Sequence, residues 1–144
     1  IVDGRHVDPV TLKIALRARP LDRFMLVTDA MPTVGMIDKR FLLQGREITV
    51  RDGVCVDASG TLAGSDLDMA AAVRNAVAML GLSLEQAVRM ASAAPAAFLG
   101  LSDQRGAIAP GVAADFCLLD DDLNVAKTWI DGKENHVRKE PLPV

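Results

Sequence analysis

The stretch Phe24-Met25-Leu26-Val27-Thr28-Asp29-Ala30 decides the fold class of this sequence. Its first four residues are all apolar, which predicts a strand buried on both faces rather than an alternating, half-exposed one. On its amino-terminal side, Asp8-Pro9 opens a helix that is expected to end near Arg19-Pro20, because Asp caps free amides and Pro suits the first helical position. A short apolar stub, Ile1-Val2, precedes a polar turn at residues 3–6. The order strand, polar turn, helix, strand predicts a parallel βαβ unit and an α/β fold.

The rest of the chain carries hairpin and helix signals. Antiparallel strands are expected over 41–43, 46–51 and 54–56, followed by a glycine-flanked loop over 60–65. Helices are expected over 69–80, after the capping box Ser83 to Gln86, and over 95–100. Strands are expected again over 114–119 and 125–130, with a hairpin turn at 131–132 and a polar tail over 138–144. Ser65 and Asp68 form a looser capping box for the helix at 69–80.

Composition excludes several classes of function. The chain has 144 residues with 16 basic and 19 acidic side chains, so its net charge is −3 and it offers no basic face for nucleic acid. Its apolar runs are too short to span a membrane. Cys55 and Cys117, the two cysteines, sit in apolar strand-like contexts and are both predicted to be buried thiols, which suits a reducing cytoplasm. No secretory signal is visible, and the start at Ile1 reads as the middle of a protein.

The residues themselves point to one edge of the predicted sheet. The two histidines, His6 and His136, lie at opposite ends of the chain, so a self-contained zinc site is not expected. No nucleophile elbow, phosphate-binding loop or dinucleotide fingerprint is present. What remains is the polar segment from Asp3 to His6 and the pair Thr28-Asp29, each at the carboxyl end of a predicted parallel strand, where α/β sites form. From spacing alone, a structural interpretation is favoured, in which Asp3 and Asp29 cap loops or helices and His6 is a satisfied, partly buried histidine.

Three motifs follow one another along the chain: Asp3-Gly4-Arg5-His6-Val7-Asp8-Pro9, Leu26-Val27-Thr28-Asp29-Ala30-Met31 and Gly60-Thr61-Leu62-Ala63-Gly64-Ser65. In this order they resemble motifs of the N-acetylglucosamine-6-phosphate deacetylases of the amidohydrolase superfamily. A later stretch, residues 105–116, looks like the carboxy-terminal signature of the whole superfamily. The resemblance spans residues 1 to about 137.

This resemblance implies a (β/α)8 barrel with a small flanking β-sandwich. Such a barrel usually needs about 250 residues, so the chain is expected to be its carboxy-terminal part. On this reading residues 1–104 supply the last strand–helix units, with a hairpin insertion at about 41–56, and residues 105–137 supply strands of the sandwich. The divalent metal of the family, zinc or similar, is then bound by a Glu and two His upstream of this chain. The resemblance also implies a homodimer.

The implied reaction is hydrolysis of the N-acetyl amide of N-acetylglucosamine 6-phosphate to glucosamine 6-phosphate and acetate. Asp29 matches the catalytic carboxylate, which takes a proton from water and delivers it to the leaving amine. His6 matches the substrate-contacting histidine, with Asp3, Gly4 and Arg5 in the same binding loop. Leu62, Ala63 and Gly64 match a loop that contacts the sugar.

Two other interpretations are compatible with the sequence, one enzymatic and one not. Cyclic-amide hydrolases of the same superfamily also place an aspartate after the last barrel strand, although the motifs around Asp29 and His6 favour the deacetylase. The chain could also be an inert piece that folds only beside its missing half.

Overall fold

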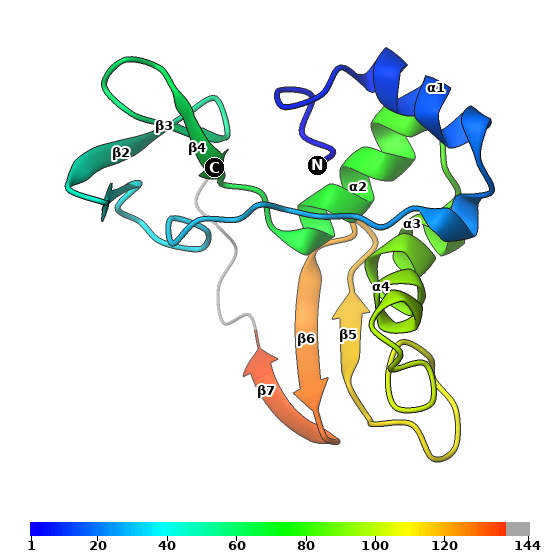
Figure 1. Ribbon diagram of the computed structural model, residues 1–144. Helices are drawn as coiled ribbons and strands as arrows, with labels where there is room; N and C mark the ends of the chain where they lie inside the picture. The colour runs from blue at the N-terminus through cyan, green and yellow to red at the C-terminus, as the bar shows by residue number, and fades with distance from the viewer. Residues whose placement is uncertain (138–144) are drawn as a thin grey trace.

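The computed structural model describes residues 1–137 and contains helices gathered on one side and two separate antiparallel sheets (Figure 1). The helices are α1 (Pro9–Ala18), the 3-10 turn η1 (Leu21–Arg23), α2 (Met69–Leu80), α3 (Leu84–Ala91) and α4 (Ala93–Phe98). The first sheet contains β1 (Arg40–Leu43), β2 (Arg46–Arg51), β3 (Val54–Val56) and β4 (Leu62–Ser65). The second contains β5 (Phe116–Leu119), β6 (Val125–Ile130) and β7 (Lys133–Val137). The α/β class is confirmed. The expected tail at 138–144 lies outside the described residues.

Helix α1 begins as predicted. The Asp8 carboxylate accepts a hydrogen bond from the backbone amide of Val10 at 2.8 Å, and Pro9 occupies the first turn. Leu12 and Leu16 turn toward the core, which α2 dominates with Ala72, Val73, Ala76 and Leu80. The position of α1 matters for the site because it fixes the carboxyl end of the loop at residues 3–6 against this core.

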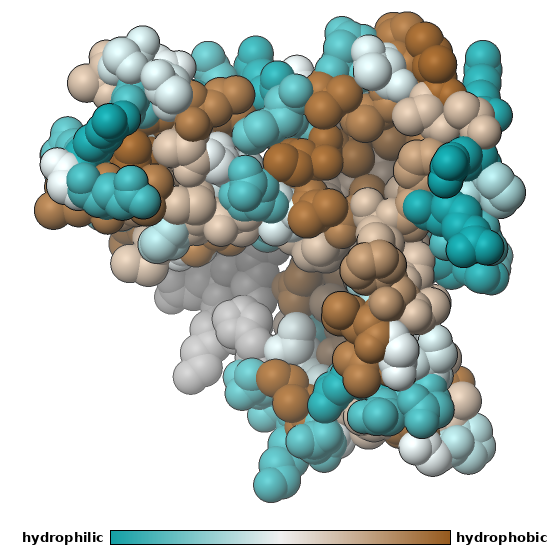
Figure 2. Space-filling view, in the orientation of Figure 1, coloured by the Kyte–Doolittle hydropathy of each residue, from teal (hydrophilic) through white to brown (hydrophobic). Residues whose placement is uncertain are grey.

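The segment 24–27 is extended but does not form a strand, which corrects the sequence prediction. Leu26 is buried in the core cluster and its amide donates to the carbonyl of Met90 at 2.9 Å. Val27 is 57% exposed. The segment crosses in front of α2 in Figure 1, and hydrophobic side chains cover the middle of the same view in Figure 2. Within residues 1–137 no strand lies alongside it, so the apolar run has no ladder to join; Ile1-Val2 is unpaired for the same reason.

The four-stranded sheet confirms the predicted hairpins and extends them by one strand. Positive φ angles at Gln44-Gly45 and Asp52-Gly53 make the tight turns that join β1 to β2 and β2 to β3. Residues 62–65, expected as part of a loop, form β4 because β3 offers them a free edge. At its end Ser65 also makes a parallel bridge to Ala30, which ties this sheet to the segment that follows residue 27.

The caps of the next helices are partly as predicted. Asp68, not Ser65, caps α2: its carboxylate accepts from the amide of Ala71 at 2.7 Å, and Gly81 ends the helix in the left-handed region. The capping box between Ser83 and Gln86 is confirmed at the start of α3. The last expected helix begins at Ala93, two residues before the predicted Pro95.

The second sheet is a simple antiparallel meander, β5-β6-β7, with the predicted turn at Asp131-Gly132. Arg74 of α2 anchors it by donating to the carbonyl of Leu123 at 2.8 Å. Cys117 in β5 is exposed, contrary to prediction, because its side of the strand is uncovered, whereas Cys55 in β3 is fully buried as expected. None of the helices within residues 1–137 combines the length and apolar character that a bilayer crossing requires.

Candidate active site

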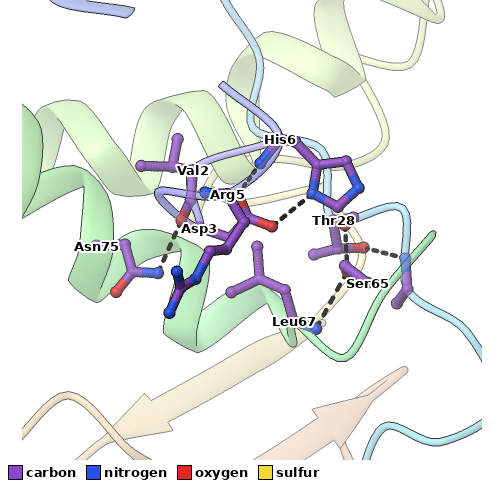
Figure 3. Close-up of polar contacts among 9 residues, drawn as sticks. Val2, Asp3, Arg5, His6, Thr28, Ser65, Leu67 and Asn75 are labelled. Carbon is purple, nitrogen blue, oxygen red and sulfur yellow. Dashed lines mark hydrogen bonds and ion pairs between the residues drawn. The ribbon is translucent and has the colours of Figure 1, made fainter. Parts of the chain in front are cut away.

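The candidate site begins with a closed network around Asp3 (Figure 3). One carboxylate oxygen accepts from the backbone amides of Arg5 and His6, both at 2.9 Å, and the other lies 2.5 Å from Nδ1 of His6. Burial alone would raise the pKa of Asp3, but these three hydrogen bonds and the nearby imidazole outweigh it, so the pKa lies below its ordinary value. The carboxylate is therefore ionised throughout the neutral range, and its contacts hold the loop 3–6 in one shape.

His6 is oriented by this carboxylate. The imidazole is 13% exposed and the Asp3 side chain 6%, so the pair is largely shielded from water. Because Nδ1 is bonded to a carboxylate, it carries the proton, and Nε2 is the nitrogen left open to another partner. Nε2 has no partner within residues 1–137 and lies on the side of the ring away from Asp3 (Figure 3). A histidine held in this way is ready to contact a polar group of a ligand.

The other members of this loop have separate tasks. Gly4 has a φ of +68°, a backbone conformation that residues with a side chain rarely adopt, and this is why the loop has glycine here. A Cβ at this position would also come within 2.7 Å of the flexible methyl end of Met79 in α2. Asn75 of α2 donates to the carbonyl of Val2 at 2.7 Å and fixes the start of the loop. Arg5 is exposed, and its guanidinium makes no ion pair with any residue of the described chain.

Asp29 occupies an unusual backbone position. Its φ is +55°, in the left-handed region that non-glycine residues seldom adopt, and its side chain is exposed. The carboxylate has no hydrogen bond or ion pair within the part of the chain that the structure describes. Backbone strain of this kind persists only where the surroundings impose it, and it concentrates at functional sites.

Strand β4 lies directly against this backbone. Leu62 is 52% exposed, whereas Gly64 is buried with a φ of +109°. A Cβ on Gly64 would lie 2.5 Å from the Met31 side chain and 3.0 Å from the Asp29 carbonyl oxygen, so only glycine permits the close approach. The motifs at 26–31 and 60–65 therefore meet, while Val2 and Leu26 share one core cluster from which the loop at 3–6 and the segment at 28–31 both emerge.

Sequence reasoning missed a polar cluster behind Asp29. Lys39 donates to the carbonyl of Thr33 at 2.9 Å and to the Asp66 carboxylate at 2.7 Å. Thr33 lies 3.7 Å from the Cys55 sulfur, and burial raises the pKa of that thiol. The second carboxylate oxygen of Asp66 is buried and has no partner among the described residues. Asp66 lies 27 positions from Lys39 and Cys55 lies 22 positions from Thr33, so no local signal could have grouped the four residues.

Replacing Lys39 by Met is expected to destabilise the protein. Asp66 is 14% exposed and would keep a charge without a partner, which costs about 3–5 kcal/mol in a fully buried pair; the 42% exposure of Lys39 reduces this to about 2 kcal/mol. Urea unfolding midpoints measure the change. Arg40→Met is the matched control, because the Arg40–Asp38 pair is 62% and 64% exposed and is worth less than about 0.5 kcal/mol. Equal midpoints for the two variants would show that the Lys39 pair is not structural.

Within residues 1–137, no group of three or more His, Cys, Asp or Glu side chains is arranged to hold a metal ion. The described residues do not by themselves fit a divalent cation.

Comparison with known proteins identifies the family of this chain. A family model described as the amidohydrolase family matches residues 15–134, which is most of the sequence. The chain belongs to the amidohydrolase family. Within it, the chain is 41% identical over 133 residues to a putative N-acetylgalactosamine-6-phosphate deacetylase of Escherichia coli K12, covering 92% of this chain and 79% of the relative. It is 42% identical to the human N-acetylglucosamine-6-phosphate deacetylase, covering 92% of this chain and 32% of that protein.

Solved structures agree with these relatives. The N-acetylglucosamine-6-phosphate deacetylase of Pasteurella multocida matches with a TM-score of 0.86 and 35% identity, covering 93% of this chain and 35% of its own. An Asp-to-Ala mutant of the Mycobacterium smegmatis deacetylase, solved in complex with N-acetyl-D-glucosamine-6-phosphate, matches with a TM-score of 0.82 and 38% identity over 92% of this chain and 36% of its own. The resemblance to the amino-sugar-phosphate deacetylases is confirmed. The chain spans most of the E. coli K12 relative and about a third of the human, Pasteurella and Mycobacterium proteins.

Proposed function

We propose that this chain is the carboxy-terminal, catalytic-aspartate-bearing part of a metal-dependent deacetylase. The enzyme would hydrolyse the N-acetyl amide of N-acetylglucosamine 6-phosphate to glucosamine 6-phosphate and acetate. The observation that carries the proposal is the junction of two deacetylase-like motifs: the Asp29 carbonyl accepts from the amide of Ser65, next to Gly64. The comparisons favour this reading over a cyclic-amide hydrolase.

Asp29 supplies the proton transfers in this proposal. Its exposed carboxylate makes no hydrogen bond or ion pair with the described chain. It takes a proton from the attacking water and then gives this proton to the amine nitrogen. Protonation of the nitrogen is essential because an amine anion is a poor leaving group. One carboxylate can therefore serve both halves of the reaction.

His6 orients the substrate in this proposal. With its Nδ1 proton held by Asp3, neutral His6 accepts at Nε2 from a sugar hydroxyl; in the protonated form Nε2 donates to the amide oxygen as negative charge develops there. Asp3 acts through His6, since both of its oxygens are already bonded within the loop. The backbones of Gly4, Arg5, Leu62, Ala63 and Gly64 complete the sugar-contacting set.

A divalent metal ion is a general feature of the amidohydrolase family. Because the described residues do not fit one, we propose that its ligands, and its identity as zinc or a similar ion, belong to a part of the enzyme outside this chain. The resemblance supports a (β/α)8 barrel whose last units are residues 1–104 and a sandwich whose strands include residues 105–137. It also supports a homodimer, and the unpaired thiols of Cys55 and Cys117 suit the cytoplasm.

The second candidate substrate is N-acetylgalactosamine 6-phosphate, the 4-epimer of N-acetylglucosamine 6-phosphate. Relatives named as N-acetylgalactosamine-6-phosphate deacetylases match at 41% identity in E. coli K12 and 45% in Shewanella, on either side of the 42% of the human relative named for the glucosamine sugar. Epimer choice changes the direction of one hydroxyl group but neither the amide nor the role of Asp29.

An acetate-release assay tests the proposal. The full-length enzyme should turn over N-acetylglucosamine 6-phosphate, with the galactosamine epimer as the competing substrate and dihydroorotate as the cyclic-amide control. The 144-residue chain alone, with added zinc, should release no acetate. Turnover of dihydroorotate instead would replace the deacetylase with the cyclic-amide hydrolase, and robust turnover by the isolated chain would contradict the division of the site.

A further inference from the structure

Ser65 makes four hydrogen bonds from a position that is 0% exposed. Its hydroxyl donates to the carbonyl of Thr28 at 2.6 Å and accepts from the amide of Leu67 at 3.1 Å (Figure 3). Its backbone amide donates to the carbonyl of Asp29 at 2.8 Å, and its carbonyl accepts from the amide of Met31 at 2.9 Å. One residue of β4 therefore binds three residues of the segment that carries Asp29, namely residues 28, 29 and 31.

Two of these bonds fix the peptide groups on either side of the Asp29 Cα atom. The Thr28 carbonyl belongs to the peptide before Asp29, and the Asp29 carbonyl belongs to the peptide after it. When both peptide planes are held, φ and ψ are held, and the direction of the Cα–Cβ bond follows from them. This accounts for the persistence of the left-handed φ of +55° in a residue that has a side chain.

Of these contacts, only those of the hydroxyl can be removed by substitution. The Asp29 carboxylate has no partner of its own in the described chain, so its direction depends on its backbone. We propose that the Ser65 hydroxyl is a positioning group for the Asp29 carboxylate: it aims the proton-transferring side chain without touching the substrate. The inference rests on the proposed function of Asp29 and names a residue that acts through it.

Ser65→Ala in the full-length enzyme tests this. We expect kcat for N-acetylglucosamine 6-phosphate to fall about 10- to 100-fold, because small errors in the placement of a catalytic group are costly, while KM changes less than about 3-fold. Ser59→Ala is the matched control. Ser59 is exposed and lies in the turn between β3 and β4. Its hydroxyl donates to the Asp57 carboxylate at 2.6 Å and not to the backbone around Asp29. Its kcat should equal that of the parent enzyme.

A double-mutant cycle separates positioning from general support of the fold. Combined with Asp29→Asn, Ser65→Ala should lower the residual rate no further, because the hydroxyl acts through a carboxylate that is no longer present. A further fall of the same 10- to 100-fold would overturn the inference and leave Ser65 as a structural residue. Ser65→Cys, which is similar in shape, slightly larger and a weaker donor, covers the case in which the alanine variant does not fold; its kcat should be intermediate, and a parental kcat would overturn the inference.

The outcomes also distinguish this inference from the proposed function. If Asp29→Asn retains parental turnover, the role of Asp29 fails regardless of Ser65. If Asp29→Asn is inactive while Ser65→Ala keeps parental kcat, only the positioning role of Ser65 fails.

Discussion

Replacement of Asp29 by Asn in the full-length enzyme is expected to lower kcat for N-acetylglucosamine 6-phosphate by about 10²–10⁴-fold. The amide is nearly the same size as the carboxylate but cannot take a proton from water and pass it to the leaving nitrogen. The side chain is exposed and makes no hydrogen bond or ion pair within residues 1–137, so the fold and the metal content should be unchanged. Steady-state rates with metal analysis of the same samples measure the effect.

Asp38→Asn is the control for this variant. Asp38 is another exposed carboxylate, 64% accessible, and its ion-pair partner within residues 1–137 is the exposed Arg40, so its loss should leave kcat unchanged. Turnover close to the parental rate in Asp29→Asn would remove Asp29 from the reaction.

Replacement of His6 by Asn should lower kcat/KM by about 10²–10³-fold, the scale observed when one donor to a developing charge is removed. The Asn amide can still donate to Asp3 in place of Nδ1, so the loop keeps its shape, but nothing replaces Nε2. Steady-state kinetics on the same substrate check this. The other histidine, His136 in β7, provides the control, and His136→Asn should behave as the parent. Equal kcat/KM for both variants would show that His6 has no contact with the substrate.

Local signals predicted the elements that depend on neighbours in sequence. The Asp8 cap, the Asp-Gly turn at 52–53 and the Ser83 capping box all involve residues within four positions of each other, and all three are confirmed. The run at 24–27 fails as a strand because a strand needs partners, and the described chain offers none beside it. The prediction that Cys117 is buried is wrong for a related reason, because an apolar strand sequence does not indicate which face of the strand is covered.

The candidate site divides in the same way. His6 and Asp29 were predicted as site residues because their motifs are contiguous, and the structure adds what orients each of them. Ser65 was misread as a helix cap, because its hydroxyl partner, the carbonyl of Thr28, lies 37 positions away in sequence. Lys39 and Asp66, separated by 27 positions, escaped notice for the same reason. Contacts between residues so far apart in sequence follow from the packing of β4 against the segment that carries Asp29. No spacing of residues in the sequence predicts this packing.

In the proposed mechanism, Asp29 and His6 face one substrate. A crystal structure of the full-length Asp29→Asn variant with N-acetylglucosamine 6-phosphate bound measures this directly. We expect the acetamide group within hydrogen-bond distance of residue 29 and a polar atom of the sugar or acetamide within hydrogen-bond distance of His6 Nε2. A sugar bound with its acetamide away from residue 29, or beyond the reach of His6, would contradict it.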